Sequence, residues 1–296
     1  MKTETDFKTR NAKPKWLKAS IPSGENYFKI KKELERKNLS TICRSAKCPN
    51  ISECWNNHHA TFLIMGDTCS RACSFCSVKK GSPRPLHPEE ADRILEMVEI
   101  MRTKYVVITS VTRDDLEDGG SAHFAAVIKK IKSSGRDLKL EVLIPDFKGN
   151  KEHLDRVFAA GADVLNHNLE TVKSLYEKVN RKPQNYYVSL SVLKAAKEKQ
   201  PVTKSGIMVG LGETKADLDE LFHDLRENGV GLLTIGQYLQ PTAENLPVAK
   251  FYSPGEFEEL KKTALSFGFA AVEAGPFVRS SYNAGRMYRQ GLGKGG

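Results

Sequence analysis

The sequence predicts an α/β protein whose main body is a partial (β/α)6 barrel of the TIM type. From about residue 60 onward, short apolar segments alternate six times with amphipathic segments of helical period. Repeated strand–helix units form a parallel sheet with right-handed crossovers, and six units are fewer than the eight of a closed barrel. Polar and glycine-rich segments follow the expected strands, at the end of a parallel barrel where active sites lie. We therefore expect these segments to converge around one cavity.

The elements are expected in strict alternation. The strands lie at 61–65, 105–110, 139–144, 163–168, 203–209 and 231–239. The helices lie at 88–101, 121–132, 151–159, 185–199, 215–227 and 254–267. In the first helix Ile94, Val98 and Met101 fall on one face, as a core-facing helix requires. Glycine, which favours a helix C-cap, follows three helices, at positions 135, 161 and 229.

The rest of the chain lies outside this repeat. Residues 1–60 are expected to form an N-terminal extension on the barrel mouth, residues 61–268 the barrel, and residues 269–296 a C-terminal segment. No apolar run is long enough to span a bilayer. The N-terminus lacks an apolar signal segment, and its Glu4 and Asp6 disfavour a transit peptide. We therefore expect a cytoplasmic protein with reduced thiols, and a monomer by default.

The net charge of +10 is concentrated at the two ends of the chain. Residues 1–40 contain eleven Lys/Arg and five Asp/Glu, which gives +6, and residues 279–296 contain four Lys/Arg and no acid, which gives +4. Two interpretations explain this charge distribution equally well: solvated basic termini, or a basic rim that docks an acidic protein. Binding to nucleic acid is disfavoured, because no recognition motif accompanies the charge.

All six cysteines lie between positions 43 and 76, in two triplets of different spacing. The first triplet is Cys43, Cys48 and Cys54, and the second triplet is Cys69, Cys73 and Cys76. This concentration indicates metal chemistry, because buried structural cysteines would be scattered over the core. Three thiolates on a four-iron cluster leave one iron with an open coordination position. Zinc would need a fourth ligand, for which His58 and His59 are the nearest candidates in sequence, and a disulfide is disfavoured in a reducing compartment.

The spacing C-x3-C-x2-C in a loop directly after a strand resembles the cluster loop of radical S-adenosylmethionine (SAM) enzymes. Together with the first triplet, it makes the chain closely similar to the lipoyl synthase family. The similarity covers almost the whole chain. It rests on ATFLIMGDTCSRACSFC at 60–76, VTRDDLEDGG at 111–120, NHNLETV at 166–172, MVGLGE at 208–213, QYLQP at 237–241 and GPFVRSSY at 275–282.

This resemblance implies SAM and two 4Fe–4S clusters as cofactors. The second triplet would hold the cluster that binds and cleaves SAM, and the first triplet would hold an auxiliary cluster that is consumed as the sulfur source. A serine of the Arg-Ser-Ser-Tyr motif would ligate the fourth iron of the auxiliary cluster. We assign this role to Ser280, with Ser281 as the nearby alternative.

Other residues receive weaker assignments from the same resemblance. Six residues are expected to bind SAM: Gly119, Gly120, Asn168, Glu170, Gly210 and Gly212. A tight turn explains both glycine pairs nearly as well, and helix capping explains the Asn and Glu. His167 is expected to be a hydrogen-bonded barrel histidine in preference to a proton donor. Arg279 is expected to orient the serine-bearing segment, with a surface salt bridge as its alternative.

The implied activity is that of a sulfurtransferase. It would insert two sulfur atoms at C6 and C8 of an octanoyl group on a lysine of a lipoyl-carrier domain. Expected partners are octanoylated E2 subunits of 2-oxo acid dehydrogenases, the glycine cleavage H protein, and a ferredoxin or flavodoxin type reductant. The alternatives are radical sulfur insertion into a small precursor, a two-cluster electron carrier, and a nucleic-acid-binding protein.

Overall fold

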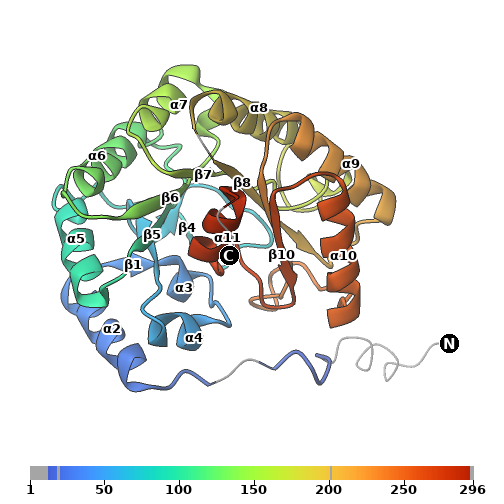
Figure 1. Cartoon of the computed structure of the whole chain (residues 1–296), viewed down its shortest axis with the longest axis horizontal. Helices are drawn as coiled ribbons and strands as arrows, with labels where there is room; N and C mark the ends of the chain where they lie inside the picture. The colour runs from blue at the N-terminus through green and yellow to red at the C-terminus, as the bar shows by residue number, and fades with distance from the viewer. Residues whose placement is uncertain (1–12, 19–20, 201, 294–296) are drawn as a thin grey trace.

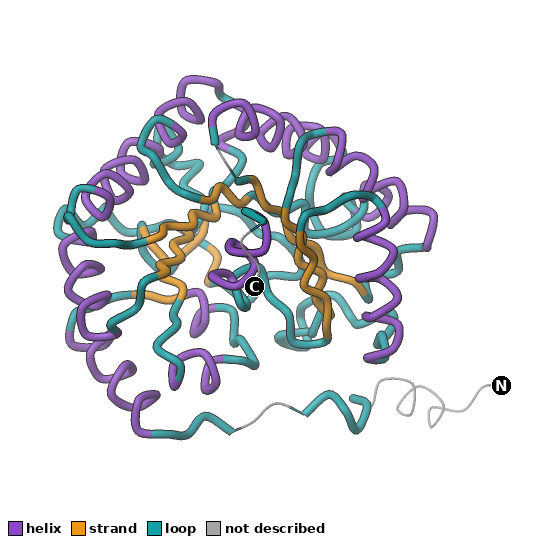
Figure 2. The backbone as a smooth tube through the Cα atoms, in the orientation of Figure 1, coloured by secondary structure: helices purple, strands orange, loops and turns teal. Residues whose placement is uncertain are grey.

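The computed structural model describes residues 13–18, 21–200 and 202–293. Its main feature is an eight-stranded sheet that curves around a central space, with helices on the outside (Figures 1 and 2). In spatial order the strands are β1 (Ser40–Thr41), β2 (Thr61–Ile64), β5 (Tyr105–Ser110), β6 (Lys139–Leu143), β7 (Val164–Asn166), β8 (Thr203–Val209), β9 (Leu232–Gln237) and β10 (Ala271–Gly275). All neighbours pair in parallel except β1 and β2, which pair in antiparallel. Because β1 and β10 are not paired in the described part of the chain, the barrel is open, as predicted.

Six helices alternate with the parallel strands and cover the outside of the sheet (Figure 1). They are α5 (Glu90–Met101), α6 (Ser121–Lys132), α7 (Lys151–Phe158), α8 (Gln184–Lys199), α9 (Lys215–Glu227) and α10 (Pro254–Ser266). The last two begin at capping boxes, Thr214 with Asp217 and Ser253 with Glu256, which satisfy backbone donors at the helix start. The predicted strands and helices are therefore confirmed, with ends that differ by a few residues at most.

The two ends of the sheet were not predicted. β10 lies in the C-terminal segment and pairs with β9, so that a seventh parallel strand joins the predicted six. Its sequence AVEAG is short and contains the charged Glu273, so it lacks the apolar run of a buried strand. β1 contains two residues only. The division at residues 60 and 268 remains a prediction, although strands from both flanking parts belong to the same sheet.

The N-terminal extension packs beside β2 at one edge of the sheet. It forms α2 (Glu25–Arg36), α3 (Ile42–Ser45) and α4 (Ile51–Asn56). Tyr27 of α2 stacks on Trp55 of α4 with ring centroids 5.3 Å apart. The residues before Lys13, which hold part of the basic N-terminus, lie outside the described residues.

The chain after β10 links the two edges of the open barrel. The Asn50 side chain donates a hydrogen bond to the carbonyl of Phe277 over 2.6 Å, and the Tyr282 hydroxyl donates to Glu53 over 3.1 Å. The final helix α11 (Ala284–Gly291) then packs under the barrel, where its buried Met287 contacts the amino ends of the strands. In the described residues, no helix is long and apolar enough to cross a lipid bilayer.

Candidate functional site

A cavity of about 330 Å³ opens at the carboxyl ends of the strands. Its wall contains the last residues of four strands: Ser110, Leu143, Asn166 and Gln237. The whole second triplet and two cysteines of the first triplet also line it. The polar segments that follow the strands therefore meet around one cavity.

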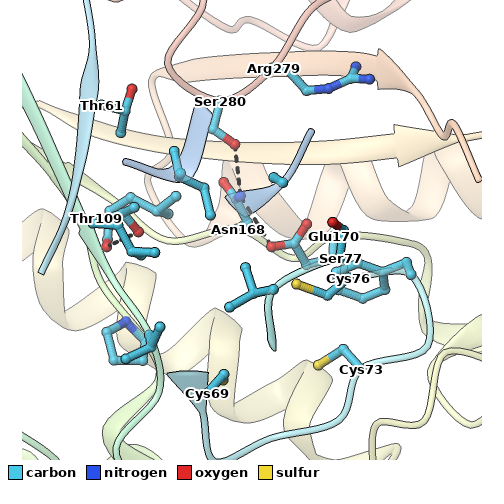
Figure 3. A pocket seen from close by; sticks show the side chains of 18 of the residues that line it. Thr61, Cys69, Cys73, Cys76, Ser77, Thr109, Asn168, Glu170, Arg279 and Ser280 are labelled. Atoms are coloured by element: carbon cyan, nitrogen blue, oxygen red, sulfur yellow. Dashed lines mark hydrogen bonds between the residues drawn. The ribbon is translucent and has the colours of Figure 1, made fainter. Parts of the chain in front are cut away.

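The second triplet lies in a loop whose two ends are tied together. The loop leaves β3 (Thr68–Cys69) and returns at β4 (Lys79–Lys80), and these two short strands pair in parallel. In its middle, the backbone N–H of Ser74 donates to the carbonyl of Val179 over 3.1 Å. Figure 3 shows the three cysteines of the second triplet around one shared space.

Arg71, between the first two cysteines of this loop, is held by two carboxylates. Its Nε donates to Asp114 over 2.6 Å, and its Nη1 donates to Asp146 over 2.6 Å. Although burial raises the pKa of Asp146, the hydrogen bonds from Arg71 hold it well below its ordinary value. Because Asp114 follows β5 and Asp146 follows β6, this pair of salt bridges fixes the loop to two strand ends.

Burial favours the protonated form of most of these thiols. It raises the pKa of Cys76 to about 11 and also raises the pKa of Cys73. The sulfur of Cys69 accepts hydrogen bonds from the backbone N–H groups of Arg71 and Thr112, each over 3.4 Å. A metal group that binds here must therefore displace protons from the buried thiols.

The first triplet lies on α3, on α4 and on the turn between them. A second cavity, of about 350 Å³, is lined by all three of its cysteines. Burial raises the pKa of Cys43 to about 11 and that of Cys54 to about 12. The Ser77 hydroxyl, next to the second triplet, donates to the carbonyl of Ser45 over 2.9 Å, which links the two cysteine-bearing segments.

The spacing of the sulfur atoms argues against zinc. In the part of the chain that the structure describes, neither triplet has its three sulfur atoms all within 4.8 Å of one another. A tetrahedral zinc ion would hold its sulfur ligands about 3.8 Å apart, given Zn–S bonds of about 2.3 Å. Three thiolates are the donor set that leaves one iron of a four-iron cluster open.

The two cavities share one wall. Six residues line both: Cys43, Cys48, Thr61, Val107, Arg279 and Ser281. A group held by the first triplet therefore faces the same internal space as a group held by the second. The shared wall brings together residues from the N-terminal extension, from β5 and from the C-terminal segment.

Asn168, Glu170 and Ser280 form a hydrogen-bonded group on the wall of the first cavity (Figure 3). Asn168 Nδ2 donates to Ser280 Oγ over 2.7 Å and to Glu170 Oε1 over 3.2 Å. Burial raises the pKa of Glu170. Its backbone is left-handed, with φ of 71°, and is held there by hydrogen bonds to Gly206 and Met208 of β8. Asn168 is thus a wall residue of the cavity and does not cap a helix.

The two serines of the C-terminal motif have different surroundings. Ser280 lines only the first cavity and accepts the hydrogen bond from Asn168. Ser281 lines both cavities, including the one that contains the complete first triplet. The structure thus places both candidates near the cysteines and gives only Ser281 access to the second cavity.

The four glycines that were expected to bind SAM do not line either cavity. Gly119 and Gly120 have φ of 60° and 82° and form the turn that begins α6. Gly210 has φ of 99°, and a Cβ there would lie 2.2 Å from Gln237 Nε2. Gly212 is likewise left-handed and faces Lys178. These positions need glycine for turns and close packing, and their contact with SAM stays a prediction.

His167 has both ring nitrogens engaged. Nδ1 lies 2.9 Å from the carbonyl of Ile144, and Nε2 lies 2.9 Å from Ser189 Oγ. Burial lowers the pKa of His167 to about 4, so the ring is neutral near pH 7. His167 is therefore a hydrogen-bonded barrel histidine, which was the favoured interpretation.

Several buried polar atoms of the first cavity have no partner among the described residues. They are Ser110 Oγ, Asn166 Oδ1, Asn168 Oδ1, and Nε and Nη1 of Arg181. Buried polar groups are nearly always hydrogen-bonded, so these donors and acceptors are available to water or to a polar ligand in the cavity. A ligand with a carboxylate, an amino group and hydroxyls, such as SAM, fits this set.

Sequence reasoning missed Arg71, Asp146 and Arg181. The first two could have been predicted from the sequence, because Arg71 lies within the cysteine loop and Asp146 follows an expected strand. Arg181 lies after η2 (Lys173–Leu175), away from any strand end, and no signal in the sequence identifies it.

Comparison with known proteins gives consistent matches. Residues 63–225 match the radical SAM superfamily, and residues 2–48 match the N-terminal domain of lipoyl synthase of the radical SAM family. A lipoyl synthase from Bacillus cereus strain ATCC 14579 is 49% identical over 292 residues, which is 98% of this chain and 97% of that protein. A lipoyl synthase from Rubrobacter xylanophilus is 49% identical over 93% of this chain and 86% of its own length.

Solved structures share the fold at low sequence identity. SuiB of Streptococcus suis, bound to its precursor peptide, superposes with a TM-score of 0.57 at 13% identity, over 87% of this chain and 55% of that protein. Methylornithine synthase superposes with a TM-score of 0.52 at 16% identity, over 84% of this chain and 71% of its own. At such identities these matches support the barrel fold alone.

Proposed function

Because this chain belongs to the lipoyl synthase family of the radical SAM superfamily, we propose that a protein-bound octanoyl group is converted into a lipoyl group at its two adjacent cavities. Its function is that of a lipoyl synthase, and its cofactors are SAM and two 4Fe–4S clusters. When bound, these cofactors supply radical hydrogen abstraction and sulfur. The roles of individual residues, set out below, are proposals.

The second triplet would hold the cluster that binds SAM, in a loop that Arg71 keeps fixed to the strand ends. Arg181, with two unpaired nitrogens on the cavity wall, would bind the carboxylate of SAM. Asn168 has a free carbonyl oxygen and Glu170 a carboxylate, and both would accept hydrogen bonds from the amino or ribose groups.

The first triplet would hold the cluster that donates sulfur, with a serine oxygen as the fourth ligand. Ser280 is the candidate from the sequence. The lining of the second cavity supports Ser281, because Ser281 lines the space around the complete first triplet. A hard alkoxide ligand among soft thiolates suits a site that must open.

The octanoyl chain needs apolar room between the two triplets. Leu63, Val107, Val111 and Leu143 line the first cavity and offer such a surface. Apolar walls also exclude water from a reactive site and hold the substrate in one orientation. The substrate would therefore lie with C6 and C8 between the second triplet and the first.

Lipoyl-carrier domains are the substrates that this function implies. We further propose that these include octanoylated E2 subunits and the glycine cleavage H protein, that a ferredoxin or flavodoxin type protein supplies electrons, and that the enzyme is a cytoplasmic monomer.

One observation carries the proposal: the second triplet and two cysteines of the first line one cavity, whose wall also offers apolar side chains and polar atoms without partners among the described residues. The alternative, a two-cluster electron carrier, would need the two clusters but no cavity for a substrate. The test is an anaerobic single turnover of reconstituted enzyme with SAM, a strong reductant and an octanoyl-lysyl peptide, followed by mass spectrometry.

The expected product contains two added sulfur atoms, and two fewer hydrogens once it is oxidised to lipoyl. Cys43→Ala should abolish sulfur transfer and leave SAM cleavage intact, whereas Cys69→Ala should abolish both. Reaction of a small free precursor in place of the peptide would favour a different sulfur-inserting enzyme. Absence of SAM cleavage by the reconstituted enzyme would favour the electron carrier.

A further inference from the structure

Arg279 is a half-buried cation without a carboxylate partner in the described residues. Its only hydrogen bond there runs from Nη1 to the carbonyl of Val278, its neighbour in sequence, over 2.7 Å. The one ionisable group near enough to affect its pKa is the Cys48 thiol, while burial lowers that pKa. The surface salt bridge that is the alternative role for Arg279 is not formed between residues that the structure describes.

The chain pairs other arginines around the barrel mouth. Arg71 contacts Asp114 and Asp146, and the buried Arg113 contacts Asp115. Leaving a buried charge unpaired costs several kcal/mol, which is why such charges are normally matched. Arg279, like Arg181, lacks such a match among the described residues, and its position needs a physical reason.

The position of Arg279 is well fixed. Its segment approaches β9 so closely that a Cβ on Gly236 would lie 2.2 Å from the carbonyl of Val278 and 3.2 Å from Arg279 Nη1. The hydrogen bonds from Asn50 to Phe277 and from Tyr282 to Glu53 hold the two sides of the segment against α4. The guanidinium is therefore held on the wall that the two cavities share, beside Cys48.

A second donor near the first triplet is also unpaired. The indole Nε1 of Trp55 is buried and has no hydrogen-bond partner in the described residues. Burial raises the pKa of the Cys43 thiol, and the adjacent Trp55 side chain offsets part of that effect. The Trp55 indole and the Arg279 guanidinium therefore lie beside two cysteines of the first triplet, Cys43 and Cys48.

We propose that Arg279 is the built-in counter-ion of the metal–thiolate group held by the first triplet. The proposal rests on the function proposed for that triplet. A four-iron centre ligated by thiolates and an alkoxide is anionic, and its one-electron reduction adds further negative charge. A fixed cation beside it favours both retention of the group and its reduction.

The test isolates the first triplet by using Cys69→Ala, Cys73→Ala and Cys76→Ala in one parent chain. The parent is loaded anaerobically with Fe²⁺ and sulfide, and its midpoint potential is measured by titration with mediators and electron paramagnetic resonance. R279Q should shift the potential to a more negative value, and R279K should remain close to the parent. The matched control is R286Q, because Arg286 lines the second cavity but already pairs with Glu273 over 2.5 Å.

Unfolding in urea separates a counter-ion from a structural arginine. Without metal, R279Q should be at least as stable as the parent, because it removes an unpaired charge. With the cluster bound, R279Q should lose iron to a chelator faster than the parent does.

Equal potentials in parent and R279Q would overturn the proposal. Failure of R279Q to fold without metal would also overturn it, because a counter-ion without its partner cannot be needed for folding. If the parent itself binds no iron–sulfur centre, the function proposed for the first triplet fails, which is a separate result.

Discussion

Asn168 donates a hydrogen bond to Ser280 over 2.7 Å, although the two residues are 112 positions apart in the sequence. Asn168 follows β7, and Ser280 follows β10 at the far edge of the sheet. The chain after β10 must turn back into the barrel for them to meet. This contact places the serine pair between the two cysteine triplets and motivates the first prediction.

Ser281→Ala is expected to reduce iron retention at the first triplet more than Ser280→Ala does, because only Ser281 lines the cavity that contains all three cysteines. Iron content and electron paramagnetic resonance of the chain without the second triplet measure this directly. Ser280→Ala should instead remove the hydrogen bond that holds the Asn168 side chain, and so weaken SAM binding. The reverse ranking of iron retention would return the ligand role to Ser280.

Arg71→Ala should destabilise the fold by about 2–4 kcal/mol, because it leaves the buried carboxylate of Asp146 without its partner. The second triplet should also bind its cluster less well, since its loop loses two anchors. Urea unfolding and iron content measure the two effects. Arg93→Ala removes an exposed helical pair with Glu89 and serves as control, with an expected loss of about 0.3–0.5 kcal/mol. Equal losses in both variants would contradict the role of Arg71.

The stability of the metal-free protein should fall as the pH decreases from about 6.5 to 4, because burial lowers the pKa of His167 to about 4. In this interval the unfolded chain binds a proton that the folded chain excludes, so acid favours unfolding. The contribution is of the order of 3 kcal/mol. Urea unfolding at several pH values should show a weaker pH dependence in His167→Gln. An unchanged slope in that variant would disprove the assignment.

Gly206→Ala should disrupt the group around Ser280. A Cβ at this position would lie 2.7 Å from Thr234 Oγ1, 2.8 Å from Asn168 Oδ1 and 2.9 Å from Ser280 Oγ. Overpacking of this kind costs about 1–3 kcal/mol. Gly231→Ala is the control, because a Cβ there meets nothing closer than Thr203 O at 3.7 Å. Thermal unfolding and SAM binding should both separate the two variants, and equal behaviour would contradict the packing argument.

Charge reversal at Lys13, Lys15 and Lys18 should slow turnover on an octanoylated carrier domain if the basic N-terminus docks an acidic partner. Turnover on a short octanoyl-lysyl peptide should not change, because the peptide lacks the docking surface. Steady-state kinetics at two salt concentrations compare the substrates. Unchanged turnover on the carrier domain would exclude this docking surface.

Much of the fold follows from local patterns. The segments 105–110, 121–132, 203–209 and 215–227 match the observed elements at both ends, because apolar periodicity and capping residues act over a few positions. β10 could not be predicted in this way. It is held by pairing with β9, and its own sequence has no strand-like apolar run.

The sequence by itself determined the chemistry: two cysteine triplets of defined spacing, and strands whose carboxyl ends carry polar residues. Both are properties of short segments. The tertiary structure decided which distant groups meet. It paired Asn168 with Ser280 and Arg71 with Asp146, kept four glycines out of the lining of the cavity, and left Arg181 and Arg279 without carboxylate partners in the part of the chain that the structure describes. These outcomes depend on the curvature of the whole sheet and on the return of the chain after β10. Contacts between distant segments follow from this overall arrangement and from no single residue.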